Sequence, residues 1–557
     1  MRTGHSTTHN TLSTQGTHTA GTTEVLVVGA GPVGLALALG LARAGVACRV
    51  VEREPGFRDR GVRGKAITPR TLEVFDDLGV VDAILDRGTL NLKVRTYEGD
   101  RVVGEVDPAP ANRPTPDRPY SGALLLAQHH TEAVLRERLA GYGVTVETGT
   151  ELVGHTQDAD GVLATLRRGG HDGGDGHDGH DGHDGHEGRD GQDGRTEQLT
   201  ARYLVGCDGG RSTVRKLAGI PFLGETWDEE RFLMATMDVD GLETDRMHLW
   251  NHPRLGIGAL VLVPMREDGT WAAHASVEPD GHGELPAPTL ETFRRLFAER
   301  AGLPGVRLHE PTWSTVWRPT VRMVERYRDG RVFLAGDAAH CHSAAGGQGM
   351  NTGIQDAHNL SWKLAAVLRG GPEALLDSYQ AERLPVAAAV LAATSAQHRR
   401  LFSADGARAL TDQFVSMSTA GGADFTGLSV DYRGGPLGRD LDDTTGIRAG
   451  DRAPDAPCTT ADGTPTRLFD LFRGPHFTLL TVGEHPAPAD VRDDADRAVP
   501  GLRRAAVLDP EGHVARAYGL RGDAVVLVRP DGYVALTGAA ADRAAVAAHL
   551  AGYAPVD

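Results

Sequence analysis

The sequence predicts an α/β protein built on a Rossmann-type dinucleotide-binding domain. Two glycine-rich segments about 300 residues apart carry this prediction. The first, Gly29–Gly34, follows an apolar run that ends at Val28, and the second, Gly336–Asn351, follows an apolar run that ends at Leu334. An apolar run that enters a glycine-rich turn before a helix is typical of the strand–turn–helix units of a parallel sheet.

The first segment has the spacing of a diphosphate-binding turn. Gly29 permits the tight turn, Gly31 lets the backbone approach a diphosphate, and Gly34 lets the next helix pack on the strand. The N–H groups and the dipole at the start of that helix favour negative charge. Glu52 lies 18 residues beyond Gly34, where an acid bonds the ribose hydroxyls of an adenosine. A βα turn without a ligand is the alternative. The residues expected to contact the dinucleotide here are Gly29, Gly31, Pro32, Val33, Gly34 and Glu52.

Three separated segments together resemble the fingerprints of class A flavoprotein monooxygenases, the aromatic hydroxylases similar to phenol hydroxylase and p-hydroxybenzoate hydroxylase. They are Gly29–Glu52, Cys207–Gly209 within the closely matching stretch Tyr203–Arg215, and the Gly336–Asp337 segment. The resemblance covers nearly the whole chain from residue 24 onward. It implies a GR2-like FAD-binding domain, an interleaved antiparallel-sheet substrate domain and a C-terminal thioredoxin-like domain.

The resemblance also implies roles for individual residues. In the family the segment that matches Asp208 and Gly209 approaches the diphosphate, and the acid that matches Asp337 bonds the ribityl chain. The loop that matches Gly346–Asn351 lies over the isoalloxazine and begins a helix, expected here over Thr352–Leu368. The further cofactor-binding residues implied in this way are Asp208, Gly209, Gly336, Asp337, Gly346, Gly347, Gly349, Met350 and Asn351.

Three more side chains are candidates for FAD contacts. Arg63 matches an arginine that contacts FAD in relatives, and its alternative role is surface ion pairing. Gln128 matches a glutamine near the ribityl and phosphate region, and its alternative role is helix capping. Arg53 is a candidate near the adenine, with a solvated charge as the alternative.

The matches divide the chain into domains. We expect a disordered tail over 1–22, a helical linker over 401–448 and a thioredoxin-like domain over 449–557. The FAD-binding domain is expected over 23–90, 121–227 and 328–400, and the substrate-binding domain over 91–120 and 228–327. The alternation of side chains along a strand defines two faces of the sheet but does not tell which face lines the substrate pocket. The candidates for the pocket are Met234, Met247, His248 and Trp250. The alternative is that these residues belong to the hydrophobic core.

A His-Asp-Gly-rich insertion over 169–195 interrupts one hairpin of the FAD-binding domain. It has too few apolar groups to fold, so we expect a solvated, disordered loop. Histidine and aspartate are metal ligands, and a metal-binding tract is therefore the alternative. No fixed ligand geometry is specified, and we expect no metal site.

Composition excludes several classes of partner. The chain has 557 residues, enough for about three domains, and 40% hydrophobic residues. Its formal charge of −17 argues against nucleic acid and anionic membranes. The sequence has no apolar run of the length that spans a membrane, and its first 20 residues lack the apolar core of a signal peptide. We therefore expect a cytoplasmic protein, with a homodimer as one expectation for its assembly.

The four cysteines, Cys48, Cys207, Cys341 and Cys458, have neither metal-binding nor CxxC spacing. Buried, inert thiols are expected, with Cys341 beside the second glycine segment as the one candidate for reactivity. The absence of a redox pair and of a second dinucleotide fold excludes the disulfide-reductase branch of FAD proteins.

The resemblance implies FAD-dependent hydroxylation of an electron-rich aromatic substrate, phenolic or polyketide, with NADPH or NADH as reductant and O₂ as co-substrate. The expected oxidant is a flavin C4a-hydroperoxide, so no protein nucleophile is needed and no catalytic side chain is identified. Many relatives have proline where this chain has Ala344, and this departure is the one feature that points to the alternative of a non-catalytic flavin- or aromatic-binding protein. A flavin-dependent halogenase is a weaker alternative, because the WxWxIP motif is absent.

Overall fold

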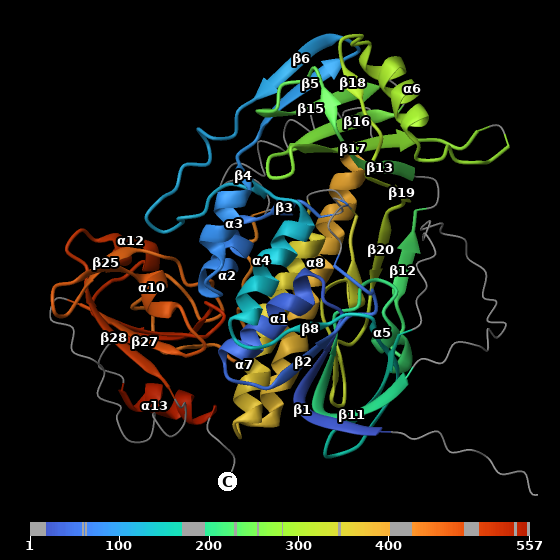
Figure 1. Ribbon diagram of the computed structural model, residues 1–557. Helices are drawn as coiled ribbons and strands as arrows, with labels where there is room; N and C mark the ends of the chain where they lie inside the picture. Colours follow the sequence, from blue (N-terminus) through green and yellow to red (C-terminus); the bar gives the residue numbers. More distant parts are fainter. Residues whose placement is uncertain are drawn as a thin grey trace, which may run out of the picture.

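The computed structural model describes residues 18–57, 61, 64–169, 195–227, 231–252, 255–280, 282–343, 347–401, 426–483, 501–539 and 543–553. The described chain forms three bodies: a central α/β domain, a sheet domain at one end of it, and a C-terminal domain on its flank (Figure 1).

The central domain is built on a sheet with the strand order β21-β22-β11-β1-β2-β8, to which β9 and β10 are attached. β1 runs parallel to β2 and β11. Its segment Val25–Val28 is buried throughout, as expected for a parallel strand covered on both faces. The strands are β1 (His18–Val28), β2 (Cys48–Val51), β8 (Val146–Glu147), β9 (Thr150–Gln157), β10 (Val162–Arg168), β11 (Arg195–Gly206), β21 (Arg328–Asp329) and β22 (Val332–Leu334).

Long helices pack beside this sheet, and α1 contacts both α4 and α7 (Figure 1). A Cβ on Gly40 of α1 would lie 2.5 Å from Oγ of Ser361 in α7, so glycine is required for this close approach. The helices are α1 (Pro32–Arg43), α2 (Pro69–Asp77), α3 (Val81–Arg87), α4 (Gln128–Ala140), α5 (Thr213–Leu217), α7 (Gly349–Leu368) and α8 (Asp377–Leu401), with the 3₁₀ turns η1 (Gly336–Ala338) and η2 (Glu373–Leu376).

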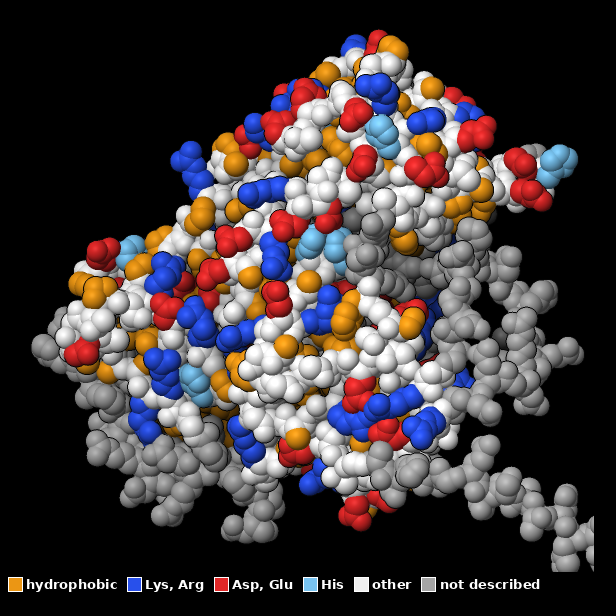
Figure 2. Space-filling model, in the orientation of Figure 1, with side chains coloured by type: hydrophobic (Ala, Val, Ile, Leu, Met, Phe, Trp, Pro, Cys, Tyr) orange, Lys and Arg blue, Asp and Glu red, His pale blue; other side chains and the backbone are white. Residues whose placement is uncertain are grey.

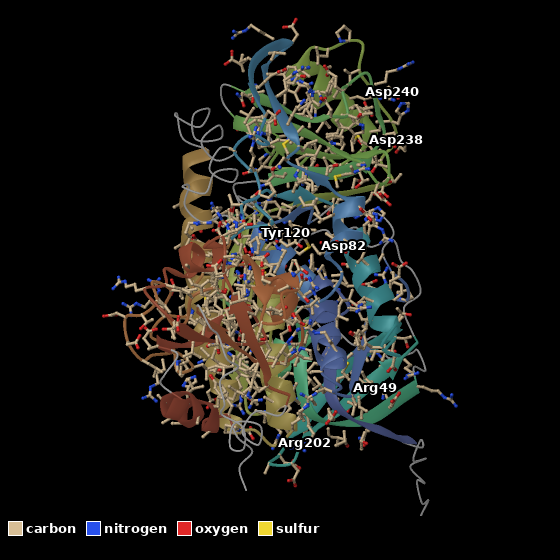
Figure 3. The ribbon with its side chains drawn as sticks, turned by 90° about the vertical axis from the view of Figure 1, so that its left-hand side faces the viewer. Arg49, Asp82, Tyr120, Arg202, Asp238 and Asp240 are labelled. Carbon is tan, nitrogen blue, oxygen red and sulfur yellow. The ribbon has the colours of Figure 1, made fainter. Side chains whose placement is uncertain are left out.

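Two small sheets complete the central domain, with the orders β3-β7-β4 and β12-β20-β23. Their strands are β3 (Ala66–Ile67), β4 (Thr89–Leu90), β7 (Leu124–Leu125), β12 (Leu223–Thr226), β20 (Thr320–Met323) and β23 (His340–Cys341). Tyr120, labelled in Figure 3, lies where the chain returns from the sheet domain, and its hydroxyl donates to Oδ2 of Asp76 at 2.9 Å.

The sheet domain has the strand order β19-β13-β17-β16-β15-β5-β6 and combines two separate chain segments. Its neighbouring strands are antiparallel except β5 and β15, which are parallel. The expected antiparallel sheet is therefore confirmed, with one parallel pair where the two chain segments meet. The elements are β5 (Lys93–Glu98), β6 (Arg101–Val106), β13 (Arg231–Met237), β14 (Val239–Asp240), β15 (Arg246–His252), β16 (Gly256–Met265), β17 (Thr270–Val277), α6 (Leu290–Ala301), β18 (Arg307–Leu308) and β19 (Trp313–Trp317).

The two faces of this sheet have different neighbours. Trp250 and Trp271 face outward and pack with Phe293 and Phe297 of α6. The opposite face carries Met247, which packs in a cluster with Ala127 of the central domain. The inner face of the sheet is therefore the one that meets the central domain.

The C-terminal domain is a seven-stranded sheet with the order β24-β30-β29-β27-β28-β25-β26. β27 and β28 are parallel, β29 is antiparallel to both of its neighbours, β27 and β30, and the edge strand β24 is parallel to β30. The elements are β24 (Arg439–Asp440), β25 (Pro457–Thr460), β26 (Pro465–Arg467), α10 (Leu468–Phe472), β27 (Thr478–Val482), β28 (Arg503–Leu508), α12 (His513–Tyr518), β29 (Ala524–Val528), β30 (Val534–Ala539) and α13 (Arg543–Ala551).

Two segment boundaries differ from expectation. The expected tail is wrong over 18–22, because β1 begins at His18 and pairs with the long partner β11. The expected helical linker is wrong over 426–448, which contains no helix and adds the edge strand β24 to the C-terminal sheet. The rest of that linker and nearly all of the His-Asp-Gly insertion lie outside the described residues.

Two observations bear on partners. None of the described helices is long and apolar enough to cross a membrane. On the face shown in Figure 2, basic and acidic side chains are interspersed.

A buried cluster of charges joins the C-terminal domain to α7 and α8. Glu382 of α8 accepts from Nζ of Lys363 at 2.7 Å and from Nη1 of Arg529 at 2.6 Å. Arg529 also pairs with Asp531 at 2.5 Å, and Trp362 donates to the same carboxylate at 2.9 Å. Burial alone would raise the pKa of Glu382, but the charges of Arg529 and Lys363 hold it below its ordinary value. The cluster is therefore ionised and satisfied.

Glu382→Gln tests this cluster. Breaking a buried ion pair costs about 3–5 kcal/mol, so we expect a lower melting temperature in scanning calorimetry at neutral pH. Because the pKa of Glu382 is depressed, its stabilisation is present above the unfolded pKa of about 4.3 and is lost as the pH falls toward the folded pKa. The difference between the variant and the wild type therefore shrinks in acid.

Glu299→Gln is the matched control. Glu299 pairs with Arg295 at 3.4 Å, and both side chains are about half exposed (54% and 53%). Such a surface pair contributes about 0–1 kcal/mol. Equal melting temperatures for the two variants would contradict the importance of the buried cluster.

Candidate functional site

The turn between β1 and α1 is built on three glycines with different constraints. Gly29 has φ +100°, and a Cβ there would lie 2.5 Å from the carbonyl oxygen of Cys207. A Cβ on Gly34 would lie 2.0 Å from the carbonyl oxygen of Gly29. A Cβ on Gly31, in contrast, would meet no protein atom within 4 Å. Two glycines are thus required by packing, and the third faces open space.

The N-terminus of α1 faces the same space. Gly31 is its N-cap, Pro32 occupies the first turn, and no side chain caps the helix or places an acid in that turn. Its N–H groups remain available for an anion. Glu52, at the end of β2, accepts from the N–H of Ala30 at 2.9 Å and from that of Glu54 at 3.1 Å.

The second glycine segment touches the first through Val33. A Cβ on Gly336 would lie 2.8 Å from Cγ2 of Val33, and one on Gly353 would lie 2.6 Å from the same atom. Val33 therefore packs between η1 and α7. The two segments, far apart in the sequence, form one site.

Helix α7 begins at Gly349, three residues earlier than expected, so Gly349, Met350 and Asn351 belong to its first turn. Asn351 is buried and donates to the carbonyls of Ala66 and Gly347 at 2.9 and 2.8 Å. Its Oδ1 accepts from the N–H of Thr68 at 2.9 Å. These hydrogen bonds hold residues 349–351 in the first turn of the helix, where the glycine-rich sequence alone predicts a loop.

Around η1, Asp337 is exposed between buried neighbours. Gly347 has φ +61°. Gly346 and Ala344 lie outside the described residues, so their expected roles stay predictions.

A buried network supports η1 and was not predicted from the sequence. Oδ2 of Asp356 accepts from the N–H of Gly336 at 3.1 Å and lies 2.6 Å from Nε2 of His340. Its Oδ1 accepts from Nε of Arg383 at 2.7 Å. Burial would raise the pKa of Asp356, but Arg383 and His340 hold it below its ordinary value. The available signal was Asp356 itself, the one acidic residue in the sequence of α7.

The side chain of Asp208 forms hydrogen bonds with the start of α5. Its Oδ2 accepts from the N–H groups of Thr213 and Val214 at 2.7 and 3.1 Å, and its Oδ1 accepts from Ser212 at 2.5 Å. Burial raises the pKa of Asp208 despite these donors. Gly209 has φ +79°, and a Cβ on it would meet no heavy atom within 4 Å. The backbone at Gly209 is therefore the part of this segment that faces open space.

Of the three additional candidates, Gln128 is the first residue of α4, and its side-chain amide is hydrogen-bonded within the protein. Its Oε1 accepts from the N–H of Gly64 at 3.2 Å, and its Nε2 donates to Glu132 at 2.8 Å. Arg53 is 52% exposed and pairs with Glu54 at 3.4 Å, which favours a solvated charge. Arg63 lies outside the described residues.

All four cysteines are free. Burial raises the pKa of Cys48 and of Cys458 to about 12. It also raises the pKa values of Cys207 and Cys341 well above the ordinary range. Cys341 is therefore a thiol and a poor nucleophile at neutral pH.

The structure of the sheet domain shows which of the candidate pocket residues lie on the face toward the central domain. Met234 pairs with His274 across β17, and both lie on the inner face with Met247. His248 and Trp250 lie on the outer side: His248 bonds Tyr97 at 2.7 Å and Trp250 packs on Phe297. The alternative of plain core positions holds for His248 and Trp250.

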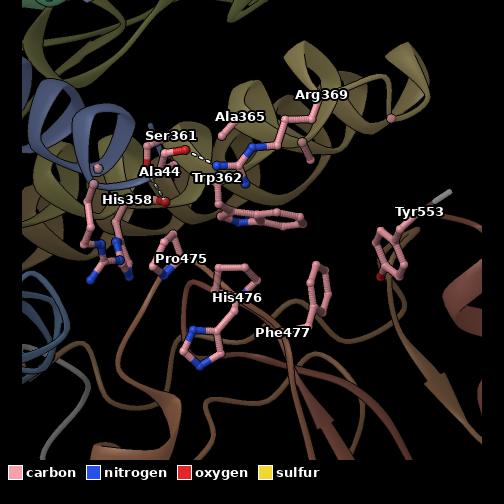
Figure 4. A pocket seen from close by; sticks show the side chains of 15 residues that line it. Ala44, His358, Ser361, Trp362, Ala365, Arg369, Pro475, His476, Phe477 and Tyr553 are labelled. Carbon is pink, nitrogen blue, oxygen red and sulfur yellow. Dashed lines mark hydrogen bonds between the residues drawn. The ribbon is translucent and has the colours of Figure 1, made fainter. Parts of the chain in front are cut away.

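A separate cavity of about 70 Å³ lies between the central and C-terminal domains (Figure 4). Ser361, Trp362, Phe477 and Tyr553 are among its lining residues. It is less than half the size of a cavity of roughly 150 Å³ that admits benzene. It is too small for a dinucleotide, and the glycine segments do not line it.

The residues present fit FAD. The open space at Gly31, the uncapped start of α1 and the acid at the end of β2 match a diphosphate and a ribose. The start of α7 supplies a second helix N-terminus, beside the exposed Asp337. Which of these groups touch the cofactor stays a prediction.

Comparison with known proteins identifies the family. Residues 22–394 match the FAD binding domain family, and residues 447–553 match the C-terminal domain of aromatic-ring hydroxylases. A flavin-dependent monooxygenase of Mycobacteroides abscessus is 39% identical over 531 residues, covering 92% of this chain and 96% of the relative. The 6-methylpretetramide 4-monooxygenase of Streptomyces rimosus is 34% identical, covering 92% and 90%.

Among solved structures, aklavinone-11 hydroxylase in its ternary complex with FAD and aklavinone is similar to this chain over 95% of the chain and 98% of that structure. The TM-score is 0.77 and the sequence identity is 30%.

Gly31→Val tests the open space at the first turn. The N-cap backbone (φ −72°, ψ −178°) accepts any side chain, so the fold is retained while the valine fills the space expected for the diphosphate. We expect at least about tenfold weaker FAD binding, about 1.4 kcal/mol, measured as flavin absorbance per protein chain and by titration of the apoprotein.

Gly305→Val is the matched control, because its Cβ would also meet no atom within 4 Å but lies in the sheet domain. Melting curves check that both variants fold. Full FAD content in Gly31→Val would refute the assignment of this space to the diphosphate.

Proposed function

Because this chain belongs to the FAD-binding aromatic-ring hydroxylases and is a flavoprotein monooxygenase, we propose that it hydroxylates an electron-rich aromatic substrate of the polyketide class. NADPH or NADH is the proposed reductant and O₂ the co-substrate. A small phenol is the competing substrate class.

The contact of Val33 with Gly336 and Gly353 carries this proposal. It aligns two helix N-termini, those of α1 and α7, along one site. A single extended cofactor with an anionic diphosphate at one end and an aromatic ring system at the other fits such a site. When bound, FAD supplies the redox chemistry, accepting two electrons from the nicotinamide and activating O₂.

The protein's own residues bind and orient the cofactor in this proposal. The backbone at Gly31 and the start of α1 hold the diphosphate, and Glu52 accepts from the ribose hydroxyls. The positive end of the α7 dipole favours negative charge on the ring system, because four N–H groups at a helix start lack intrahelical partners. Asp337 holds the ribityl chain.

The inner face of the sheet domain supports an aromatic substrate. Phe232 and Trp317 lie on adjacent strands of this face with ring centroids 5.6 Å apart, and both are partly accessible. Flat aromatic molecules bind well against such rings. The substrates named for two similar proteins, 6-methylpretetramide and aklavinone, support the polyketide class.

Several finer expectations stay predictions: a cytoplasmic location, a homodimer, the absence of nucleic-acid partners, and the choice between NADPH and NADH. The non-catalytic alternative rests on Ala344, which lies outside the described residues. Halogenation is a third alternative, distinguished by its chlorinated product.

Anaerobic stopped-flow reduction tests the proposed function. We expect NADPH or NADH to bleach the flavin of the holoenzyme faster when an aromatic polyketide is present than with buffer alone, because substrate binding completes the site. A panel of polyketides and simple phenols at equal concentration identifies the class. A flavin that stays oxidised with every donor and ligand would contradict turnover and favour the binding-protein alternative.

A further inference from the structure

A lysine–histidine pair joins the central domain to the sheet domain and has no role in the function described so far. Nζ of Lys65, in the segment before β3, lies 2.8 Å from Nε2 of His274 in β17. The two residues are 209 positions apart in the chain. Their contact is therefore a product of the fold.

The pair lies beside the start of α7. Lys65 precedes Ala66, whose carbonyl accepts from Nδ2 of Asn351 at 2.9 Å. A Cβ on Gly347 would lie 3.1 Å from Cβ of Ala66. Lys65 is thus one residue from the segment that contacts the helix start assigned above to the flavin ring.

The pair lies on the inner face of the sheet domain, where several side chains keep some accessible surface. His274 aligns across the inner face with Met234 and Val261. Lys65, His274 and Val261 retain accessible surface, whereas the neighbouring Ala272 and Val263 are closed. The partly accessible rings of Phe232 and Trp317 lie on the same inner face.

Lys65 has no carboxylate partner among the described residues, and its hydrogen bond is to His274. Burial lowers the pKa of Lys65 to about 8. Burial and the charge of Lys65 lower the pKa of His274 well below its ordinary value. At neutral pH Lys65 is therefore an ammonium group that donates to a neutral imidazole.

This arrangement favours the binding of an anion beside Lys65. An ammonium group has three N–H donors, and His274 accepts one of them. A desolvated cation without a counter-ion is unfavourable, and an oxygen anion at hydrogen-bond distance offsets that cost. Lysine is also rare here: it accounts for four of the 58 Lys and Arg residues. A compact ammonium leaves more room for a ligand than a guanidinium does.

We propose that Lys65 binds the ionised oxygen of the aromatic substrate, a phenolate or the enolate of a β-dicarbonyl, and that His274 positions the ammonium group. This rests on the proposed function, since it assigns the site to the substrate of that reaction. The O–H bond of the substrate breaks on binding, its proton passes to water, and the oxygen anion pairs with Nζ. The negative charge enriches the ring in electrons at the positions to be hydroxylated.

Titration of a bound chromophoric phenol tests the proposal independently of turnover. The probe is para-nitrophenol, whose phenolate absorbs differently from the neutral phenol, recorded as a difference spectrum on the FAD-loaded protein. We expect the wild type to lower the pKa of the bound probe by about one to three pH units. Lys65→Met abolishes this shift, and Lys65→Arg retains a shift in the same direction because the positive charge is kept.

The control and the positioning variant sharpen the test. Lys216→Met removes an exposed lysine of α5 and keeps the full shift. His274→Gln retains Lys65 and gives a smaller shift. The midpoint potential of the flavin is measured in every variant and is expected to be unchanged in Lys65→Met.

The probe titration can overturn the proposal while leaving the proposed function intact. One such result is a bound probe whose pKa is the same in the wild type and in Lys65→Met. Another is a changed flavin potential in Lys65→Met with no change in the probe, which would assign Lys65 to the cofactor. A wild-type protein that binds no phenol would also overturn this proposal. The proposed function is tested separately, by the bleaching of the flavin with NADPH or NADH.

Discussion

The contact of one valine with two glycines is the constraint on which the rest of the central domain depends. Val33, in the first turn of α1, occupies the space that a side chain on Gly336 or Gly353 would need. Packing at this density tolerates no added methyl group without displacement. The positions of η1 and α7 are therefore fixed relative to the first glycine turn, and one continuous site can hold both ends of a long cofactor.

Charge extends this constraint to the C-terminal domain. Asp356 holds the N–H of Gly336 and pairs with Arg383, whose Nη1 donates to the hydroxyl of Tyr432 at 3.1 Å. The guanidinium of Arg529 lies over the same ring, 5.3 Å from its centroid. A chain of buried polar contacts thus connects the glycine turn at η1 to the C-terminal sheet. A thioredoxin-like domain that lacks a cysteine pair has a physical role here, since it supplies counter-charges and hydrogen-bond partners to α7 and α8.

The glycine turns could be predicted from the sequence because their constraints are local. A tight turn, a close helix and an open backbone each require glycine at a fixed spacing, and Gly29, Gly31 and Gly34 have that spacing. The Asp356–Arg383 pair could not be predicted in this way, because its partners are chosen by the packing of α7 on α8. The start of α7 differs from the expected residue for a related reason. The side chain of Asn351 donates a hydrogen bond to Ala66, which is far away in the sequence. The length of β1 likewise depends on β11, which offers hydrogen-bond partners as far back as His18.

The sheet domain shows the limit of periodicity most clearly. Alternation along β13, β15 and β17 separates the side chains into two sets but does not say which set meets the central domain. The apolar face of α6 decides it, because Phe293 and Phe297 cover the side that carries Trp250 and Trp271. The other side is left for His274, a polar residue in the middle of a strand whose neighbours are mostly alanine. A polar side chain at such a position needs a partner, and the fold supplies a lysine from a segment 209 residues away. That lysine brings a positive charge to the face of the sheet that meets the central domain, so the polarity of this face is set by tertiary packing.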